Sequence, residues 1–233
     1  MLKAILIDVG GPLVDEDEFY RRTDRLILDL LVRWGRPVSQ DEYQHVLKDY
    51  TARCYPAPRG AALWHFLRPD LQLFKRGREA IVKEIEGWRA TTVRPGAREA
   101  VAALAERYTL ALAGNQRARV KDLLRKAGIL EHFMFQLVSE ELQVAKPDPL
   151  FLQVILDSLK IKPHEAVMVG DRLDYDIYPT RLLGMRAVRV LVGPYAEQEP
   201  QTPFHEPDIM INTIAELPSA IARLASVERG GSS

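Results

Sequence analysis

Short apolar runs recur along the chain and alternate with stretches whose apolar residues return at helical spacing. The first run, Ala4 to Ile7, is continuously apolar, as expected for a strand that is buried on both faces of a parallel sheet. The later runs lie at 108–113, 135–138, 166–169, 187–191 and 209–211. This alternation predicts an α/β fold in which a parallel sheet is flanked by helices through right-handed crossovers.

The stretch between the first two runs is helical throughout. Apolar residues recur at helical spacing from Asp17 to Trp34, and Ser39 followed by Glu42 indicates a capping box at the start of a second helix. Further helical pieces are expected at 63–67 and 77–88. Because no strand pattern interrupts this stretch, it predicts a wholly helical insert.

The same pattern divides the chain into two domains and a tail. Residues 1–15 and 92–229 are predicted to form the α/β core domain, residues 16–91 the helical domain inserted into it, and residues 230–233 a disordered tail. In the core, the helices expected between the strands lie at 96–107, 116–127, 149–159, 175–183 and 214–224.

Composition narrows the class of protein. The chain has 233 residues, of which 47% are hydrophobic, enough for a sizeable core. Lys and Arg balance Asp and Glu at 32 each, so the net charge points to neither a nucleic-acid partner nor an anionic membrane. The single cysteine, Cys54, excludes an internal disulfide, and no apolar segment reaches the ~18 residues of a transmembrane helix. We therefore expect a cytoplasmic protein.

Candidate chemistry begins where the first strand ends. Asp8 closes the first apolar run, and Gly10, Gly11 and Pro12 follow it directly. These residues break the strand and let backbone N–H groups turn toward the Asp8 carboxylate. A carboxylate at the carboxyl end of a central strand lies where open α/β sheets bind ligands. Taken alone, this stretch is equally compatible with an aspartate that only caps a turn.

Polar residues also follow later strands. After the run at 108–113, Gly114 and Asn115 stand at an expected helix start, where free N–H groups hold anions, and Lys146 precedes another expected helix. The strongest signal follows the strand at 166–169, where three acids lie within six residues. These acids are Asp171, Asp174 and Asp176. Hard cations such as magnesium bind carboxylate oxygens of this kind, so we expect a metal site there.

In this order, the residues resemble the four motifs of the haloacid dehalogenase-like (HAD) hydrolase superfamily. The motifs are an aspartate after the first strand, an amide-bearing turn after the next, a Lys-Pro before a helix, and a Gly-Asp with a second Asp five positions on. The resemblance covers nearly the whole chain. It implies a Rossmann-like core and identifies the helical insert, residues 16–91, as a cap domain.

The resemblance also implies an aspartyl-phosphate mechanism with magnesium as cofactor. The family's nucleophile, which attacks phosphorus, matches Asp8. The family's magnesium ligands match Asp8, the carbonyl of Gly10 and Asp171, with Asp176 as a ligand or a neighbour of one. Lys146 is expected to neutralise Asp8 and the phosphate. The residues expected to bind the substrate phosphate are Gly11, Gly114, Asn115 and Lys146.

Three positions depart from the family's pattern. Gly10 stands where the phosphatases carry a second aspartate, which protonates the leaving oxygen and then activates water. Pro12 replaces the usual Thr or Val, and Gly114 replaces a Ser or Thr that binds phosphate. Loss of the acid/base costs about 10²–10⁴ in rate, roughly 3–5 kcal/mol of barrier. We therefore expect weak or narrowed activity.

Two sets of residues in the insert are candidates for further roles. Glu16, Asp17 and Glu18 are candidates to replace the missing acid, although acids at a helix start more often serve the helix dipole. Aromatic or cationic residues near turns of the insert are candidates for substrate selection, although packing or solvation also explains each of them. They are Tyr20, Arg59, Trp64, His65 and Arg68.

The sequence thus predicts a magnesium-dependent phosphohydrolase that acts on a small phosphorylated metabolite. One alternative is a non-catalytic protein of the same fold that binds phosphate and metal, which the glycines at 10 and 114 favour. A second is a 2-haloacid dehalogenase, which needs no metal and so leaves the acidic cluster at 171–176 unexplained. The substrate and the oligomeric state are left open.

Overall fold

The core of the fold is a parallel sheet with β1 near its centre. The structure, a computed structural model, describes residues 1–88 and 92–230. Its strands pair in the order β3-β2-β1-β4-β5-β6, and every neighbouring pair is parallel, as predicted. The strands are β1 (Ala4–Ile7), β2 (Thr109–Gly114), β3 (Phe135–Val138), β4 (Ala166–Gly170), β5 (Arg186–Val190) and β6 (Ile209–Ile211).

Helices cover both faces of this sheet. In β1, Ile5 and Ile7 face one apolar cluster, while Ala4 and Leu6 face another, so both faces of the strand are buried. The helices of the core are α5 (Ala97–Ala105), α6 (Val120–Lys126), α7 (Ser139–Leu142), α8 (Pro149–Leu159), α9 (Tyr178–Leu182) and α10 (Leu217–Gly230). Residues of α5, α6 and α10 pack in the first cluster and residues of α8 in the second. The predicted α/β architecture is confirmed.

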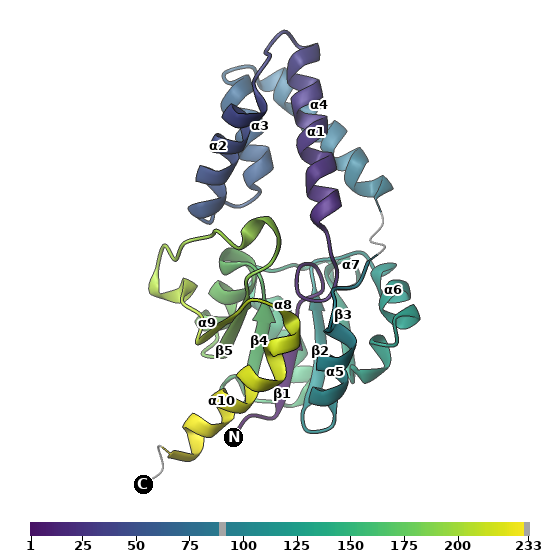
Figure 1. The fold of residues 1–233 in the computed structure, drawn as a ribbon, viewed down its shortest axis with the longest axis vertical. Helices are drawn as coiled ribbons and strands as arrows, with labels where there is room; N and C mark the ends of the chain where they lie inside the picture. Colours follow the sequence, from purple (N-terminus) through teal and green to yellow (C-terminus); the bar gives the residue numbers. More distant parts are fainter. Residues whose placement is uncertain (89–91, 231–233) are drawn as a thin grey trace.

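Between β1 and α5 the described residues form four helices joined by loops, with no strand among them. It comprises α1 (Asp17–Arg33), α2 (Gln40–Ala52), α3 (Pro58–Leu67) and α4 (Leu71–Gly87). These four helices stand beyond the carboxyl ends of the strands, at the end of the molecule opposite the two termini (Figure 1). They enclose an apolar cluster of their own, which includes Ile27, Leu31, Tyr43, Leu63 and Leu67. We refer to α1–α4 as the helical insertion.

The two connections between the insertion and the core pair with each other. The Asp15 N–H donates to the Thr92 carbonyl at 2.9 Å, and the Arg94 N–H donates to the Leu13 carbonyl at 2.8 Å. The Arg94 side chain also donates to the Gly11 carbonyl at 2.7 Å. The predicted domain boundary at 91/92 adjoins residues 89–91, which lie outside the described residues. The same is true of residues 231–233, which make up most of the predicted tail, 230–233.

Several predicted helices have different bounds, among them α3, which begins at Pro58 instead of residue 63, and α10, which spans Leu217–Gly230 instead of 214–224. Helix α4 begins at Leu71 instead of residue 77, because the Asp70 side chain accepts the N–H of Leu73. The helix predicted at 116–127 begins only at Val120, because the Ala118 N–H donates to a carboxylate oxygen of Glu140 outside the helix. The helix predicted at 175–183 is a π-helical turn, Leu173–Ile177, followed by α9.

No helix in the described part of the chain is long and apolar enough to cross a membrane.

Candidate active site

Two central strands deliver carboxylates to the same edge of the sheet. Asp8 follows β1, and its N–H continues the strand pairing by donating to the Val169 carbonyl of β4 at 2.8 Å. Asp171 follows β4 directly. Because β1 and β4 are parallel neighbours, their carboxyl ends coincide, and both side chains are buried there.

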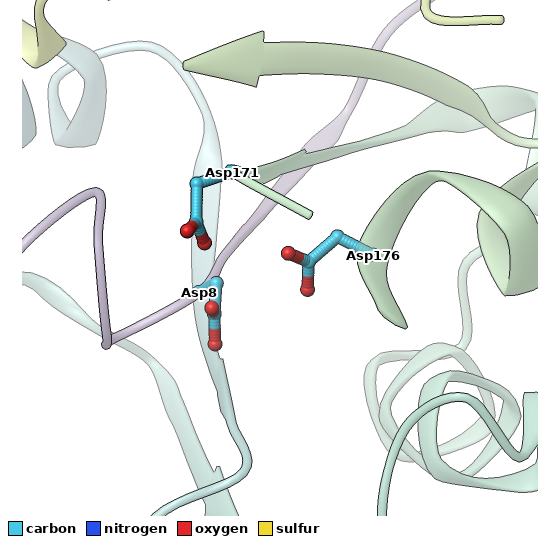
Figure 2. A group of neighbouring side chains, drawn as sticks. All are labelled: Asp8, Asp171 and Asp176. Atoms are coloured by element: carbon cyan, nitrogen blue, oxygen red, sulfur yellow. The ribbon is translucent and has the colours of Figure 1, made fainter. Parts of the chain in front are cut away.

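A third carboxylate completes an acidic cluster. Asp176 lies in the π-helical turn after β4, and the Arg172 N–H holds it by donating to its Oδ2 at 3.0 Å. One carboxylate oxygen from each of Asp8, Asp171 and Asp176 lies within 4.8 Å of the other two. Figure 2 shows these three side chains converging from separate segments. All three predicted acidic ligands are therefore brought together.

Two glycines make room for this cluster. Gly11 has a φ of +85°, and a Cβ at this position would lie 2.5 Å from Cγ of Asp171. A Cβ at Gly170 would collide with the carboxylate of Asp176. Larger residues at these two positions would therefore displace the carboxylates on which the cluster depends.

Lys146 supplies the positive charge in the cluster. Its Nζ lies 2.8 Å from Oδ1 of Asp8 and 2.5 Å from Oδ1 of Asp176, and its side chain is only 1% exposed. Asn115 fixes the lysine backbone: its Nδ2 donates to the Lys146 carbonyl at 2.7 Å, and its Oδ1 accepts the Lys146 N–H at 2.9 Å. Asn115 thus positions the lysine with both ends of its amide.

The electrostatics of the site indicate a deficit of positive charge. Burial raises the pKa of Asp8 to about 7, with Lys146 lowering it and Asp176 raising it further. Burial, with Asp176 and Asp8 nearby, raises the pKa of Asp171 well above its usual range. For Lys146, burial lowers the pKa, but the attraction of Asp176 and Asp8 prevails and raises it. One ammonium among three buried carboxylates fits a site that also takes a divalent cation.

A cavity of about 870 Å³ opens over the cluster, between core and insertion. Its floor includes Asp8, Lys146 and Asp171, and its walls include Phe19 and Trp88. Of the five predicted substrate-selecting residues, Tyr20 lines this cavity. Arg59 instead pairs with Asp24 at 2.8 Å, and the ring of Trp64 packs against Phe74.

Several lining residues were not predicted as site residues. The Arg172 guanidinium lies 3.6 Å from the ring centroid of Tyr175 and 4.1 Å from that of Tyr195. It also donates to Asp174, to which Gln198 donates at 2.8 Å. Asp174 is therefore turned away from the acidic cluster to hold Arg172. The only sequence signal for Arg172 was its position next to Asp171.

Glu16 also turns into the cavity. Its Oε1 accepts from Nε2 of Gln116 at 3.0 Å and its Oε2 from the Tyr20 hydroxyl at 3.2 Å. Burial raises its pKa, with both hydrogen bonds acting in the opposite direction. Among the three acids at the start of α1, Glu16 is thus the one that faces the site; Asp17 pairs with Arg94.

Gly11 and Gly114, which were predicted to bind the substrate phosphate, make close contacts within the protein that the sequence did not show. The Gly11 N–H donates to the Val14 carbonyl at 3.0 Å. A Cβ at Gly114 would lie 2.5 Å from Cγ2 of Val9, so the close approach of Val9 explains the absence of a Ser or Thr there. Gly114 and Asn115 do not stand at a helix start, since α6 begins at Val120. Phosphate binding by these glycines stays a prediction.

Comparison with known proteins agrees with this geometry. The family model of haloacid dehalogenase-like hydrolases matches residues 2–179, and a HAD-hydrolase-like model matches residues 143–217. The chain is 30% identical to the glyceraldehyde 3-phosphate phosphatase of Pyrococcus furiosus over 209 residues, 84% of this chain and 83% of the relative. It is also 30% identical to the phosphoglycolate phosphatase of Vibrio vulnificus over 228 residues, 93% of this chain and 94% of the relative.

Other relatives and structures are similar over part or all of the chain. Several curated phosphatases are matched over about half of their own length. A solved structure of a haloacid dehalogenase-like protein of unknown function from Agrobacterium tumefaciens has a TM-score of 0.68 at 19% identity, covering 97% of this chain and 100% of that one. The family model, the relatives and the converging motifs together confirm the resemblance: the chain belongs to the haloacid dehalogenase-like hydrolases.

Proposed function

We propose that this protein is a magnesium-dependent phosphohydrolase that works through an aspartyl-phosphate at Asp8. The observation that carries the proposal is the convergence of Asp8, Asp171, Asp176 and Lys146 at the floor of one cavity. Relatives that align with most of the chain are named as phosphatases, which supports the same reaction class.

Each residue has a distinct task in this proposal. The Asp8 carboxylate attacks phosphorus, and the Lys146 ammonium neutralises Asp8 and the incoming phosphate. Asp8, Asp171 and the Gly10 carbonyl would hold magnesium, with Asp176 as a further ligand or as the partner that orients Lys146. When bound, magnesium offsets the repulsion between carboxylate and phosphate and polarises the phosphoryl group. Asn115 keeps Lys146 in place through its two backbone hydrogen bonds.

We further propose a small phosphorylated metabolite as substrate, with the helical insertion as the cap that selects it. The two relatives matched over most of their length are named for glyceraldehyde 3-phosphate and phosphoglycolate, both of them small phosphate esters. The insertion contributes Phe19 and Tyr20 to the walls of the cavity, and Trp88, directly after α4, adds to them. A cytoplasmic location rests on the lone, buried Cys54.

The acidic cluster weighs against a metal-independent dehalogenase. Attack on carbon by Asp8 gives no role to two further buried carboxylates within 4.8 Å, whereas carboxylate oxygens are the ligands that a divalent cation takes. A non-catalytic protein that binds metal and phosphate would keep the same cluster, so a direct assay of turnover has to separate it from the enzyme.

Hydrolysis of p-nitrophenyl phosphate with and without magnesium tests the proposal. We expect turnover that requires magnesium and that Asp8→Asn abolishes, with Asp157→Asn on the exposed face of α8 as the matched control. Magnesium-independent turnover, or turnover that Asp8→Asn retains, would refute it. Calorimetric binding of magnesium and phosphate without hydrolysis would instead identify the non-catalytic protein.

A further inference from the structure

One proton transfer in the proposed reaction has no residue assigned to it. When a phosphate ester of an alcohol is cleaved, the departing oxygen needs a proton, and a positioned acid contributes about 10²–10⁴ to the rate. Asp8 is occupied as the nucleophile, and Asp171 and Asp176 belong to the cation site. Lys146 is held between two of these carboxylates.

The carboxylate of Glu16 lies in the space that a side chain at Gly10 would enter. A Cβ built on Gly10 would lie 2.5 Å from Oε2 of Glu16 and 2.5 Å from Nε2 of Gln116. Gly10 is only two residues from Asp8, and Gly10, Asp8 and Glu16 line the same cavity. Glu16 therefore presents its carboxyl group to the cavity from directly beside the nucleophile's loop.

The partners of Glu16 distinguish it from the other acids of the cavity. Both of its hydrogen bonds come from neutral donors, Nε2 of Gln116 and the hydroxyl of Tyr20. By contrast, Asp8 and Asp176 contact Lys146, and Asp122 pairs with Arg125 at 2.7 Å on the exposed rim. In the described part of the chain, Glu16 is thus the acid of this cavity that two hydrogen bonds orient and that has no lysine or arginine nitrogen within 4.0 Å.

The insertion fixes this orientation. Glu16 is the residue before α1, and Tyr20 lies one turn into that helix. The Arg59 guanidinium lies 4.5 Å from the ring centroid of Tyr20 and is itself held by Asp24. The core contributes Gln116 from the loop after β2. Contacts from both parts of the molecule thus aim the Glu16 carboxyl group at the cavity.

We infer that Glu16, directly before the first helix of the insertion, is the proton-transfer residue of the phosphohydrolase, an inference that rests on the function proposed above. In the first displacement, Asp8 bonds to phosphorus, the bond to the ester oxygen breaks, and that oxygen takes the proton of Glu16 and leaves as an alcohol. In the second, Glu16 takes a proton from water, the water oxygen bonds to phosphorus, and the bond to Asp8 breaks. Phosphate leaves, and both acids return to their starting states.

This assignment also gives Gly10 a role. A side chain at Gly10 would collide with the Glu16 carboxylate where it now lies. Glu16 can therefore lie this close to Asp8 only because residue 10 is a glycine. The acid at the start of α1 and the glycine after Asp8 therefore act as a pair, and changes at the two positions should depend on each other.

The test compares leaving groups in Glu16→Gln, which keeps the size of the side chain. Two esters are used: p-nitrophenyl phosphate, whose leaving group needs no proton, and an alkyl phosphate that the wild type turns over, chosen from a panel that includes phosphoglycolate and glycerol phosphate. We expect the alkyl turnover to fall by about 10²–10⁴. The first-turnover burst of p-nitrophenol should remain within about threefold of wild type, while its steady state slows because water is no longer activated. The matched control is Glu18→Gln, an exposed acid of the same helix turn.

A rescue variant separates lost chemistry from lost structure. Glu16→Ala removes one of the two side chains that a Cβ at Gly10 would meet and leaves the flexible end of Gln116, which loses its partner Glu16 and can move aside. Gly10→Asp in that background should therefore regain at least tenfold of the alkyl turnover, whereas Gly10→Asp with Glu16 present should lower it. The role of Glu16 would be overturned if Glu16→Gln slowed the first turnover of both esters equally, or if it did not slow alkyl turnover at all. It would also be overturned if Gly10→Asp failed to restore alkyl turnover in Glu16→Ala, or if the wild type cleaved aryl esters alone.

The same assays keep the two proposals apart. If Asp8→Asn abolishes magnesium-dependent cleavage but Glu16→Gln does not distinguish the esters, the phosphohydrolase stands and the role of Glu16 falls. If the wild type hydrolyses neither ester, the proposed function falls, and the role of Glu16 with it.

Discussion

Without metal, repulsion within the acidic cluster should make the wild-type protein less stable than a variant that lacks one of the three acids. Asp8, Asp171 and Asp176 place carboxylate oxygens within 4.8 Å of one another, and Lys146 contacts two of them at 2.8 Å or less. Replacing Asp171 by Asn removes one acid with little change in volume. We therefore expect Asp171→Asn to raise the stability of the metal-free protein while removing its response to magnesium.

The size of the effect follows from the spacing. Two full charges 4.8 Å apart repel by about 3.5 kcal/mol at an effective dielectric constant of about 20. The pKa of Asp8, raised to about 7, means that this group is partly protonated near neutral pH, and the raised pKa of Asp171 acts in the same direction, so the expected gain is smaller, about 1–2 kcal/mol. For a chain of this length that corresponds to a rise in Tm of about 2–8 °C.

The gain should depend on pH in a defined direction. The pKa of Asp8 is about 7 in the folded protein and 3.8 in its ordinary state, so the folded protein binds more protons between these values. Stability is then lost as the pH rises through this window, and Asp171, whose pKa is also raised, adds to the loss. The metal-free wild type and Asp171→Asn should differ little at about pH 5 and most at about pH 8.

Thermal unfolding in chelator and in magnesium measures both effects. At about 100 times its dissociation constant, magnesium should stabilise the wild type at pH 8 by about 2.7 kcal/mol and leave Asp171→Asn nearly unchanged. Asp157→Asn, a surface change on α8, is the control and should behave like the wild type. A wild type whose Tm ignores magnesium, or an Asp171→Asn protein that is less stable in chelator at pH 8, would refute this account.

Three further variants test the supports of the site. Lys146→Met leaves Asp8 and Asp176 without their cationic partner, so it should lower the free energy of unfolding in urea by about 3 kcal/mol and should also lower turnover. An unchanged free energy of unfolding would contradict a stabilising role for these ion pairs. Asn115→Ala loses two hydrogen bonds to the Lys146 backbone, so we expect about 1–3 kcal/mol less stability and a lower kcat; a normal kcat would show that Lys146 needs no such support. Gly170→Ala forces the Asp176 carboxylate to move and should weaken the rise in Tm with magnesium; an unchanged rise would show that Asp176 does not contribute to cation binding.

Local sequence pattern was sufficient for most of the regular elements. The strand at 135–138 and the helix at 149–159 have the predicted bounds, because a short, largely apolar run and an amphipathic helix with a proline start are specified by neighbours along the chain. The prediction failed for residues 116–119, because Glu140 and Glu16 reach this loop from other elements and satisfy groups that a helix would have used.

The amino-acid sequence by itself pointed to most of the residues to which we assign the chemistry, and to the strand ends at which the acids stand. Asp8 and Asp171 were identified from their positions after apolar runs, since parallel strands bring their carboxyl ends to one edge. Lys146 was identified from the Lys-Pro before an expected helix together with the family resemblance. The tertiary structure alone decided where side chains of the connecting segments point. In the sequence, Glu16 is an ordinary acid at a helix start. In the structure, Gln116, one hundred residues away, donates a hydrogen bond to it, and its carboxylate faces the cavity in the space that the lack of a side chain at Gly10 leaves. Such directions depend on contacts between distant segments, which periodicity along the chain does not encode.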